Sequence, residues 1–312
     1  MKKTITPQEL HIEKKIIIKE RRKQIRKWIA TLIIILFALL FLTPVILTIS
    51  NSFMSNAEID ANYGAIFSTG EDGIKPFILE RVNLKFIPDR VSFDQIKTVL
   101  LKSPTYLLKF WNSVILVVPI MVFQLLVASL ASFGFARYKG KLRALIFFLY
   151  TILMLMPYQV TLVPNYLVSD YLGLLDSYWA IWLPGIFSPF AVFLITRNLK
   201  RIPATIYEAA KIDGAGEFQI FRYICMPIIK GTVIAVAILI FIDYWNMVEQ
   251  PLIMLSDAEQ YPLSVFLSKI NEGEIGIAFA AATINMIPCL LIFLYGEKYL
   301  LEGITSQGGL KG

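Results

Sequence analysis

The chain has 312 residues, of which 56% are hydrophobic and only 17% are charged, and its formal net charge is +7. With a mean hydropathy of +0.64, this composition excludes an ordinary soluble domain. The single histidine, His11, and the two distant cysteines, Cys225 and Cys289, argue against a histidine-based site, a disulfide framework and a metal centre.

The first predicted membrane helix follows a basic segment. Residues 1–27 end in a run rich in lysine and arginine, and residues 28–49 are uninterrupted by charge. About 20 apolar residues in a helix cross a bilayer core of roughly 30 Å, so residues 28–49 are predicted to span the membrane. We expect the basic segment to orient this helix and to contact the lipid bilayer through its anionic headgroups. No nucleic acid is expected as a partner, because no aromatic-basic module accompanies it.

Five further apolar stretches follow a long polar segment. Residues 50–110 contain the turn-rich sequence GEDGIKP and are predicted to form an enlarged loop. The remaining predicted membrane helices are residues 111–135, 142–163, 178–196, 231–248 and 275–296. The predicted fold class is therefore an all-α polytopic membrane protein with six transmembrane helices, whose core is formed by residues 111–296.

The positions of lysine and arginine predict the topology. They are frequent in residues 1–27 and in the connections after the second and fourth predicted helices, whereas the connection after the third contains Asp170, Asp176 and no base. Short cytoplasmic segments carry an excess of basic residues. Both termini, including a tail at residues 297–312, are therefore predicted to be cytoplasmic, and residues 50–110 extracytoplasmic.

Residues 203–230 are polar although they connect two apolar stretches. Pro203 fits the first turn of a short helix, and Gly214 is expected to end it. A second helix is expected from Glu217, kinked by Pro227 where it enters the fifth membrane helix. Four side chains are spaced to form its buried stripe: Phe218, Phe221, Ile224 and Ile228.

The first of these short helices combines a charge with small side chains. Glu208 is followed directly by Ala209 and Ala210. Small residues let another surface approach the backbone closely, and the carboxylate can pair with a base on that surface. An ordinary amphipathic connector that lies on the membrane is the alternative interpretation.

The order of residues in this segment resembles a known motif. EAAKIDGAGEFQIFRYICMP is similar to the EAA loop of the membrane-spanning subunits of ATP-binding-cassette importers, with Met226 where leucine is usual. The matching residues are Glu208, Ala209, Ala210, Gly214, Ile224, Met226 and Pro227. Other stretches, such as ARYKGK, MPYQVTLVPNYLVSDYLGLLDSYWA and YLLEGITSQGGLKG, resemble MalG-type permeases of carbohydrate importers. The resemblance covers roughly residues 86–312.

The resemblance implies the type I importer permease fold and several partners. These are a second, MalF-like permease subunit, an ATP-binding-cassette ATPase dimer that uses ATP and Mg²⁺, and an extracytoplasmic solute-binding protein. This chain would bind no cofactor and no metal. It has no glycine-rich phosphate-binding loop and would not be an enzyme. A sugar or oligosaccharide is the implied solute, with glycerol phosphate, a polyamine or a peptide as alternatives.

The resemblance also implies two contacts with the ATPase. The helix from Glu208 to Asp213 would form the ball of a ball-and-socket contact, Gly214 permits the turn, and Pro227 passes the movement into the fifth membrane helix. The end of the chain would reach the ATPase dimer interface, through Gln307, Gly308, Gly309 and Lys311. A disordered end is the alternative for this tail.

Polar side chains at membrane depth are candidates for the solute path: Gln124, Tyr158, Gln159, Asn246 and Asn285. Such groups face protein or a water-filled path, and hydrogen bonding between helices is the other interpretation. Asp243 is expected to pack helices together with Trp245 and Asn246. An ion-coupled secondary transporter or an intramembrane enzyme would need a repeated half or a second acidic group within the spans, and neither is found in the sequence.

Overall fold

The computed structural model describes residues 7–64, 83–269 and 274–305, and within these ranges every regular element is a helix. Of residues 7–18 and 302–305 only the backbone is described. In chain order the helices are α1 (Pro7–Asn51), α2 (Asn56–Tyr63), α3 (Asp94–Lys97), α4 (Pro104–Arg137), α5 (Lys141–Leu153), α6 (Tyr158–Tyr171), α7 (Trp179–Gly185), α8 (Pro189–Leu199), α9 (Ala204–Ile212), α10 (Glu217–Gln219), α11 (Met226–Ile228), α12 (Lys230–Trp245), α13 (Glu249–Met254), α14 (Leu263–Ser268) and α15 (Ile275–Thr305). Two π-helical turns, η2 (Thr98–Lys102) and η3 (Ile220–Cys225), and a 3₁₀ turn, η4 (Ala258–Gln260), complete the set.

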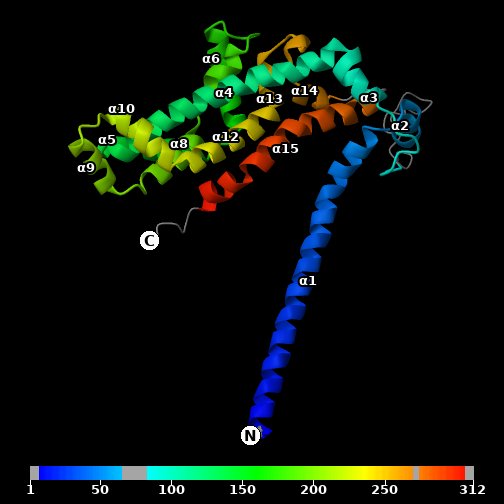
Figure 1. Cartoon of the computed structure of the whole chain (residues 1–312). Coiled ribbons are helices and arrows are strands. Elements are labelled where there is room, and N and C mark those ends of the chain that lie inside the picture. Colours follow the sequence, from blue (N-terminus) through cyan, green and yellow to red (C-terminus); the bar gives the residue numbers. More distant parts are fainter. Residues whose placement is uncertain (1–6, 65–82, 270–273, 306–312) are drawn as a thin grey trace.

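Four helices form the centre of the bundle. α4 packs along α8 and α12, and α12 packs along α15, as Figure 1 shows. One core cluster joins α4, α8 and α12 to α9 and η3. A second cluster joins α4 and α7 to the other end of α12. α4 and α12 therefore contribute to both clusters and connect the two ends of the bundle.

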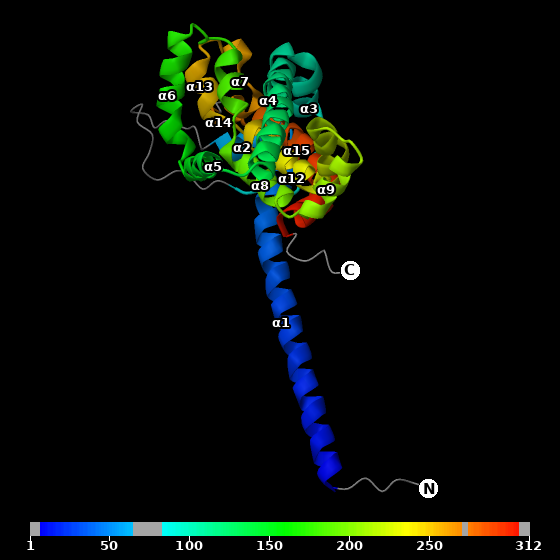
Figure 2. The ribbon, with the colours of Figure 1, turned by 90° about the vertical axis from the view of Figure 1, so that its left-hand side faces the viewer.

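α1 projects away from this bundle. In Figures 1 and 2 only its C-terminal end reaches the other helices, where it packs against α15. Its apolar side chains, such as Trp28 and Phe41, are exposed. The helix is continuous from Pro7, so residues 7–27 of the predicted basic segment extend the first predicted span. An α-helix satisfies its own backbone hydrogen bonds, and α1 can therefore cross a bilayer without support from this chain.

The described helices agree with a polytopic membrane protein. Four stretches are long and apolar enough to cross a bilayer, namely Lys19–Asn51, Pro104–Arg137, Trp179–Leu199 and Ile275–Leu301. Two helix pairs reach the required length only together: Lys141–Leu153 with Tyr158–Tyr171, bent by 105°, and Glu217–Ile228 with Lys230–Trp245, bent by 77°. The described part of the chain thus contains four such spans, or six if each bent pair is one span.

The third predicted span, residues 142–163, is wrong as a single helix. α5 ends at Leu153 and α6 begins at Tyr158 in a new direction. Pro157 explains the break, because proline has no N–H to donate and disfavours helical backbone in the residue before it. The fourth predicted span, residues 178–196, is also interrupted, since α7 ends at Gly185 and α8 begins at Pro189.

The described parts of residues 50–110 pack onto the start of α15. Met54, Ile59 and Tyr63 form a cluster with Ile275. At the opposite end, α15 continues past residue 296, the predicted end of the last span, to Thr305. The first nine residues of the predicted C-terminal tail are thus a helical continuation of the bundle.

Gly296 lets α12 and α15 approach closely, because a Cβ atom there would overlap Cδ1 of Ile238. We predict that Gly296→Ala costs about 1–3 kcal/mol by overpacking, offset in part by the gain of about 1 kcal/mol that alanine brings to a helix. Gly134→Ala, which meets no atom within 4 Å, should show the gain alone. The midpoint of thermal unfolding of the purified protein measures both.

Ile238→Val removes the overlapping atom, so in that background the two glycine variants should behave alike. Equal midpoints for Gly296→Ala and Gly134→Ala in the otherwise unchanged protein would contradict the close packing.

Candidate functional site

The turn between α9 and α10 is built around Gly214. The backbone N–H of Ala215 donates to the carbonyl of Ala210 at 2.9 Å, and that of Gly214 donates to the carbonyl of Lys211 at 3.0 Å. This pair of bonds is a Schellman motif, which needs a left-handed residue after the helix. Gly214 supplies it with a φ of +82°. The prediction that Gly214 ends the first helix is confirmed, and α10 begins at Glu217 as predicted.

α9 has one buried face and one exposed face. Tyr207 and Ala210 lie in the core cluster that includes α4 and α8. The exposed face carries Thr205, Glu208, Ala209, Ile212 and Asp213. Ile212 is 86% exposed. Ala210 therefore serves internal packing, and Ala209 is the small side chain that the exposed face presents. An apolar centre with charged residues at its edge is the composition of a protein-binding surface.

A charged and aromatic contact fastens α9 to the end of α4. The Arg137 guanidinium stacks over the ring of Tyr207, 4.9 Å from its centroid, and its Nε lies 3.5 Å from Oε2 of Glu217. Lys211 lies 2.8 Å from Oε1 of the same carboxylate. Burial raises the pKa of the Tyr207 hydroxyl. This hydroxyl accepts a hydrogen bond from the Cys225 thiol at 3.6 Å. α4, α9, α10 and η3 are thus held together as one unit, called here the coupling unit.

The second short helix buries different side chains from those predicted. Phe218 and Ile228, the ends of the predicted stripe, are 66% and 53% exposed, whereas Ile220 and Cys225 are completely buried. The two middle residues of the predicted stripe are half-buried. The reason is η3, because a π-helical turn shifts the face that an α-helical period would bury. Ile220 and Cys225 are five residues apart, the hydrogen-bond spacing of a π-helix.

The predicted kink before the fifth membrane helix is confirmed. Pro227 lies in the first turn of α11, and the axis then bends by 77° into α12. Ile229, the residue at the bend, lies in the same core cluster as Tyr207 and Ala210. The bend is therefore packed against α4 and α8 rather than free to flex.

The five polar residues proposed for the solute path lie in different surroundings. Gln124 and Asn285 are buried inside the bundle, and their side-chain oxygens have no hydrogen-bond partner in the described part of the chain. Gln159 and Asn246 are exposed. Gln159 donates to Glu249 at 3.5 Å. Tyr158 is half-buried and lines a cavity.

Asp243 does not pack with Trp245 as predicted. Trp245 is buried and stacks on Phe241 with the ring centroids 5.0 Å apart, whereas Asp243 and Asn246 are exposed. Residues two positions apart on a helix point to different sides, while residues three apart are neighbours. Asp243 and Asn246 therefore share the outer side of α12.

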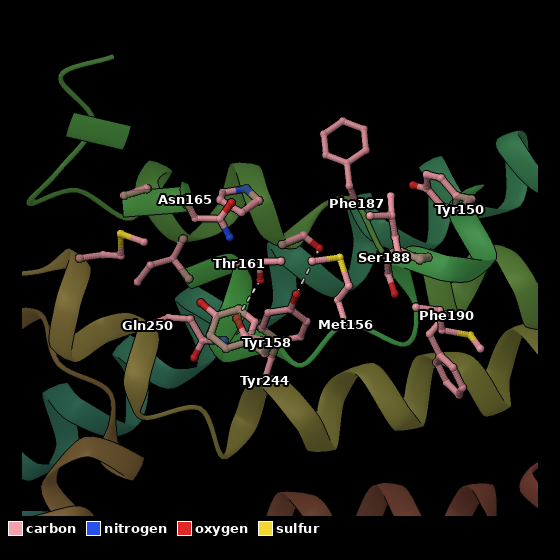
Figure 3. A pocket seen from close by; sticks show the side chains of 18 residues that line it. Tyr150, Met156, Tyr158, Thr161, Asn165, Phe187, Ser188, Phe190, Tyr244 and Gln250 are labelled. Atoms are coloured by element: carbon pink, nitrogen blue, oxygen red, sulfur yellow. Dashed lines mark hydrogen bonds between the residues drawn. The ribbon is translucent and has the colours of Figure 1, made fainter. Parts of the chain in front are cut away.

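The cavity lies where two predicted spans are interrupted. It measures about 620 Å³, and its lining includes Met154 and Met156 from the break before α6, and Phe187 and Ser188 from the break before α8. Figure 3 shows Asn165, Thr161, Tyr158, Gln250 and Tyr244 towards one end of the lining, and Ser188, Phe190 and Tyr150 towards the other. Irregular backbone at membrane depth occurs where it is buried in protein or lines a cavity.

Several residues of these two sites were missed by sequence reasoning. In the sequence, Arg137 indicates only that its connection is cytoplasmic. Apart from its helical spacing from Ala210, nothing in the sequence indicates that Tyr207 contributes to the site. Asn165 follows Pro164 and Gln250 precedes Pro251, and a polar residue beside a proline in an apolar stretch is the signal that could have pointed to them.

The structure bears only partly on the expectations for the C-terminal tail and for metal binding. Gln307, Gly308, Gly309 and Lys311 lie outside the described residues. No group of three or more histidine, cysteine, aspartate or glutamate side chains suited to a metal occurs among the residues that are described.

The left-handed backbone at Gly214 predicts a contrast between two glycines of one turn. Gly214→Ser forces a side chain into a conformation that costs about 1–2 kcal/mol, so amide hydrogen exchange across α9 and α10 should accelerate by about 5–30-fold. Gly216, with a φ of −73°, precedes α10, where serine is a favoured cap. Gly216→Ser should leave exchange unchanged or slower, and equal acceleration in both variants would contradict the assigned turn.

Comparison with known proteins identifies the family. The family model described as "Binding-protein-dependent transport system inner membrane component" matches residues 124–304. "Arabinooligosaccharides transport system permease protein AraQ" of Bacillus subtilis (strain 168) is 30% identical over 285 residues, covering 90% of this chain and 95% of that protein. "Lactose transport system permease protein LacG" of Rhizobium radiobacter is 30% identical over 203 residues, covering 64% and 74%.

A solved structure shows the same fold. A chain of the "bacterial ABC transporter involved in the import of the acidic polysaccharide alginate" matches with a TM-score of 0.74 and 21% identity, covering 89% of this chain and 98% of that one. The part of the chain that the family model matches, residues 124–304, contains the end of α4, all of α5 to α14, and α15 up to residue 304. It therefore includes the contacts that hold α9 and every residue that lines the cavity. The chain is a multi-pass membrane protein that belongs to the inner membrane components of binding-protein-dependent transport systems.

Proposed function

We propose that this chain is a permease subunit of an ATP-binding-cassette importer for a sugar or oligosaccharide. A second permease subunit and an ATPase dimer complete the translocating complex, and an extracytoplasmic binding protein delivers the solute. The chain itself binds neither ATP nor Mg²⁺, which the ATPase uses. The relatives named for arabinooligosaccharide and lactose transport support the solute class.

The observation that carries this proposal is the exposed face of α9 on a rigidly held helix. Glu208, Ala209 and Ile212 point away from the chain, while Tyr207 on the other side is clamped by Arg137. A helix held in this way moves as a rigid body when a partner pushes on it, whereas a flexible loop would absorb the movement. The face is free to enter a socket on an ATPase subunit.

The arrangement of the bundle supports the proposed orientation. The contact between Arg137 and Glu217 places the connection after α4 beside the coupling unit. At the other end, Asn112 of α4 donates to the carbonyl of Glu259 at 2.6 Å, and Asp176 accepts from the backbone of Ser256 at 2.7 Å. The basic connections thus lie at one end and the acidic ones at the other. In our proposal the basic end and both termini are cytoplasmic.

Charge reversal at Glu208 tests the docking face. If Glu208 pairs with a base in the ATPase socket, Glu208→Lys leaves like charges desolvated and costs about 3–5 kcal/mol, which is more than a hundredfold in affinity. We predict loss of ATPase assembly and of ATP-dependent uptake in proteoliposomes that contain all partner subunits. Asp60→Lys, an equal charge reversal at an exposed position of α2, should leave assembly intact. Normal assembly and uptake with Glu208→Lys would refute the docking face.

Arg137 tests the transmission of movement separately from docking. Arg137→Ala removes the stacking on Tyr207 and the pair with Glu217, a loss of about 1–2 kcal/mol in all. We predict that the ATPase still assembles and hydrolyses ATP, but that the solute transported per ATP falls several-fold. Arg137→Lys should recover part of the lost transport ratio. Lys139→Ala, which changes an exposed neighbouring residue, should show no loss. An unchanged transport ratio in Arg137→Ala would show that the clamp plays no part in coupling.

A further inference from the structure

We infer that the cavity at the two helix breaks is a binding subsite for one uncharged sugar unit of the transported solute. This inference rests on the proposed function, and it adds the location of a solute-binding site and the chemical character of the solute. The walls of the cavity come from the residues around the α5–α6 break, from α7 and α8, and from α12 and α13. Its volume of about 620 Å³ lies in the range of small-molecule sites.

The lining combines the two kinds of group that a sugar ring needs. Sugar hydroxyls both donate and accept, and amide and hydroxyl side chains can do the same. Asn165 is half-buried, lines the cavity and has no hydrogen-bond partner among the described residues. Gln250 lies beside the hydroxyl of Tyr158. The rings of Tyr150, Tyr158 and Phe190 also line the cavity, and aromatic faces can pack against the C–H groups of a sugar ring.

The charge of the lining narrows the ligand further. The residues that line the cavity include no aspartate, glutamate, lysine, arginine or histidine. An ionised solute would lose its hydration there without gaining a counter-charge, which is costly. The nearby charge is acidic, because Glu249 precedes Gln250 and accepts from Gln159 at 3.5 Å. A phosphate or uronate group would be repelled by this carboxylate, and an ammonium group would find no partner inside the cavity.

The geometry also argues against a lipid chain as the occupant. A hydrocarbon chain would leave Asn165 without a partner, and an unpaired polar group that faces hydrocarbon costs several kcal/mol. The Tyr244 hydroxyl is already used, since it donates to the carbonyl of Gly185 at 3.4 Å. This hydrogen bond holds the end of α7 against α12. The polar groups that can bind a ligand are therefore those of α6 and α13, such as Asn165 and Gln250.

Two tyrosines on α6 provide a matched test. Tyr158 lines this cavity, and Tyr166 does not, although both belong to the same helix. The complete complex in proteoliposomes is first given uncharged arabino-, malto- and galacto-oligosaccharides, together with glycerol 3-phosphate and a triuronate. Equilibrium binding of the best-transported compound to the purified complex, without binding protein, is then measured for each variant.

Loss of one hydrogen-bonding group should weaken sugar binding by about 3–10-fold. We expect this for Tyr158→Phe and for Asn165→Leu, while Tyr166→Phe keeps the affinity of the unchanged complex. ATP hydrolysis stimulated by the unloaded binding protein should be unchanged in Tyr166→Phe, whose position does not line the cavity. Because Asn165 has no partner to lose, its replacement should also leave the complex folded.

Each other outcome overturns a different statement. Absence of ATP-dependent uptake of every compound would refute the proposed function itself. Uptake with unchanged affinity in Tyr158→Phe and Asn165→Leu would refute the subsite alone. Weakened assembly of the two permease subunits with unchanged sugar affinity would show that a side chain of the second permease fills the cavity. Preference for the triuronate or the phosphate would refute the uncharged ligand.

Discussion

The whole structure depends on the cost of an unpaired backbone amide in a lipid environment. Without water to bond to, the chain satisfies its backbone within helices, and it can interrupt a helix only where protein or a cavity receives the freed groups. α1 obeys this rule although only its C-terminal end packs against other helices of the chain. The interruptions at Pro157 and before Pro189 obey it by surrounding a cavity. The breaks therefore mark the place where the bundle contains a cavity instead of continuous helices.

Much of the architecture could be predicted because the same rule makes apolar length informative. The four stretches that are long enough to span alone were recognisable as runs of apolar residues. Gly214 and Pro227 were recognisable because their backbone requirements are local. The MalG-type resemblance agrees with the family that matches the chain. A run of apolar residues does not show where a helix bends, however, and the prediction of a single helix over residues 142–163 therefore misses the break at Pro157.

The missed contacts depend on packing rather than on local preference. The buried pair Ile220 and Cys225 follows from η3, and a π-helical turn leaves no pattern in an α-helical period. Because Asp243 lies in an apolar run, the sequence favours a role in helix packing. In the structure its side chain is exposed on the outer side of α12. The role of Arg137 depends on Tyr207, 70 positions away, and single-sequence reasoning has no means of joining the two. The resemblance identifies residues 203–230 as a candidate coupling segment, and the structure shows which contacts hold this segment.

The two sites are joined by the helices that run between them. α8 begins at Pro189 in the cavity wall and ends at Leu199 in the cluster that holds the coupling unit. α12 begins one residue after the bend at Ile229 and carries Tyr244 to the cavity. At 1.5 Å per residue these helices are about 16 and 24 Å long. A displacement of α9 is therefore applied to the near ends of two walls of the cavity at once. Because close-packed interiors shift as units, the bend at Ile229 and the break before α8 are where such a displacement can change the shape of the cavity. In our proposal, the clamp at Arg137 and the cavity at Tyr158 are thus two ends of one mechanical path, in which α8 and α12 connect the coupling unit to the interrupted helices around the cavity.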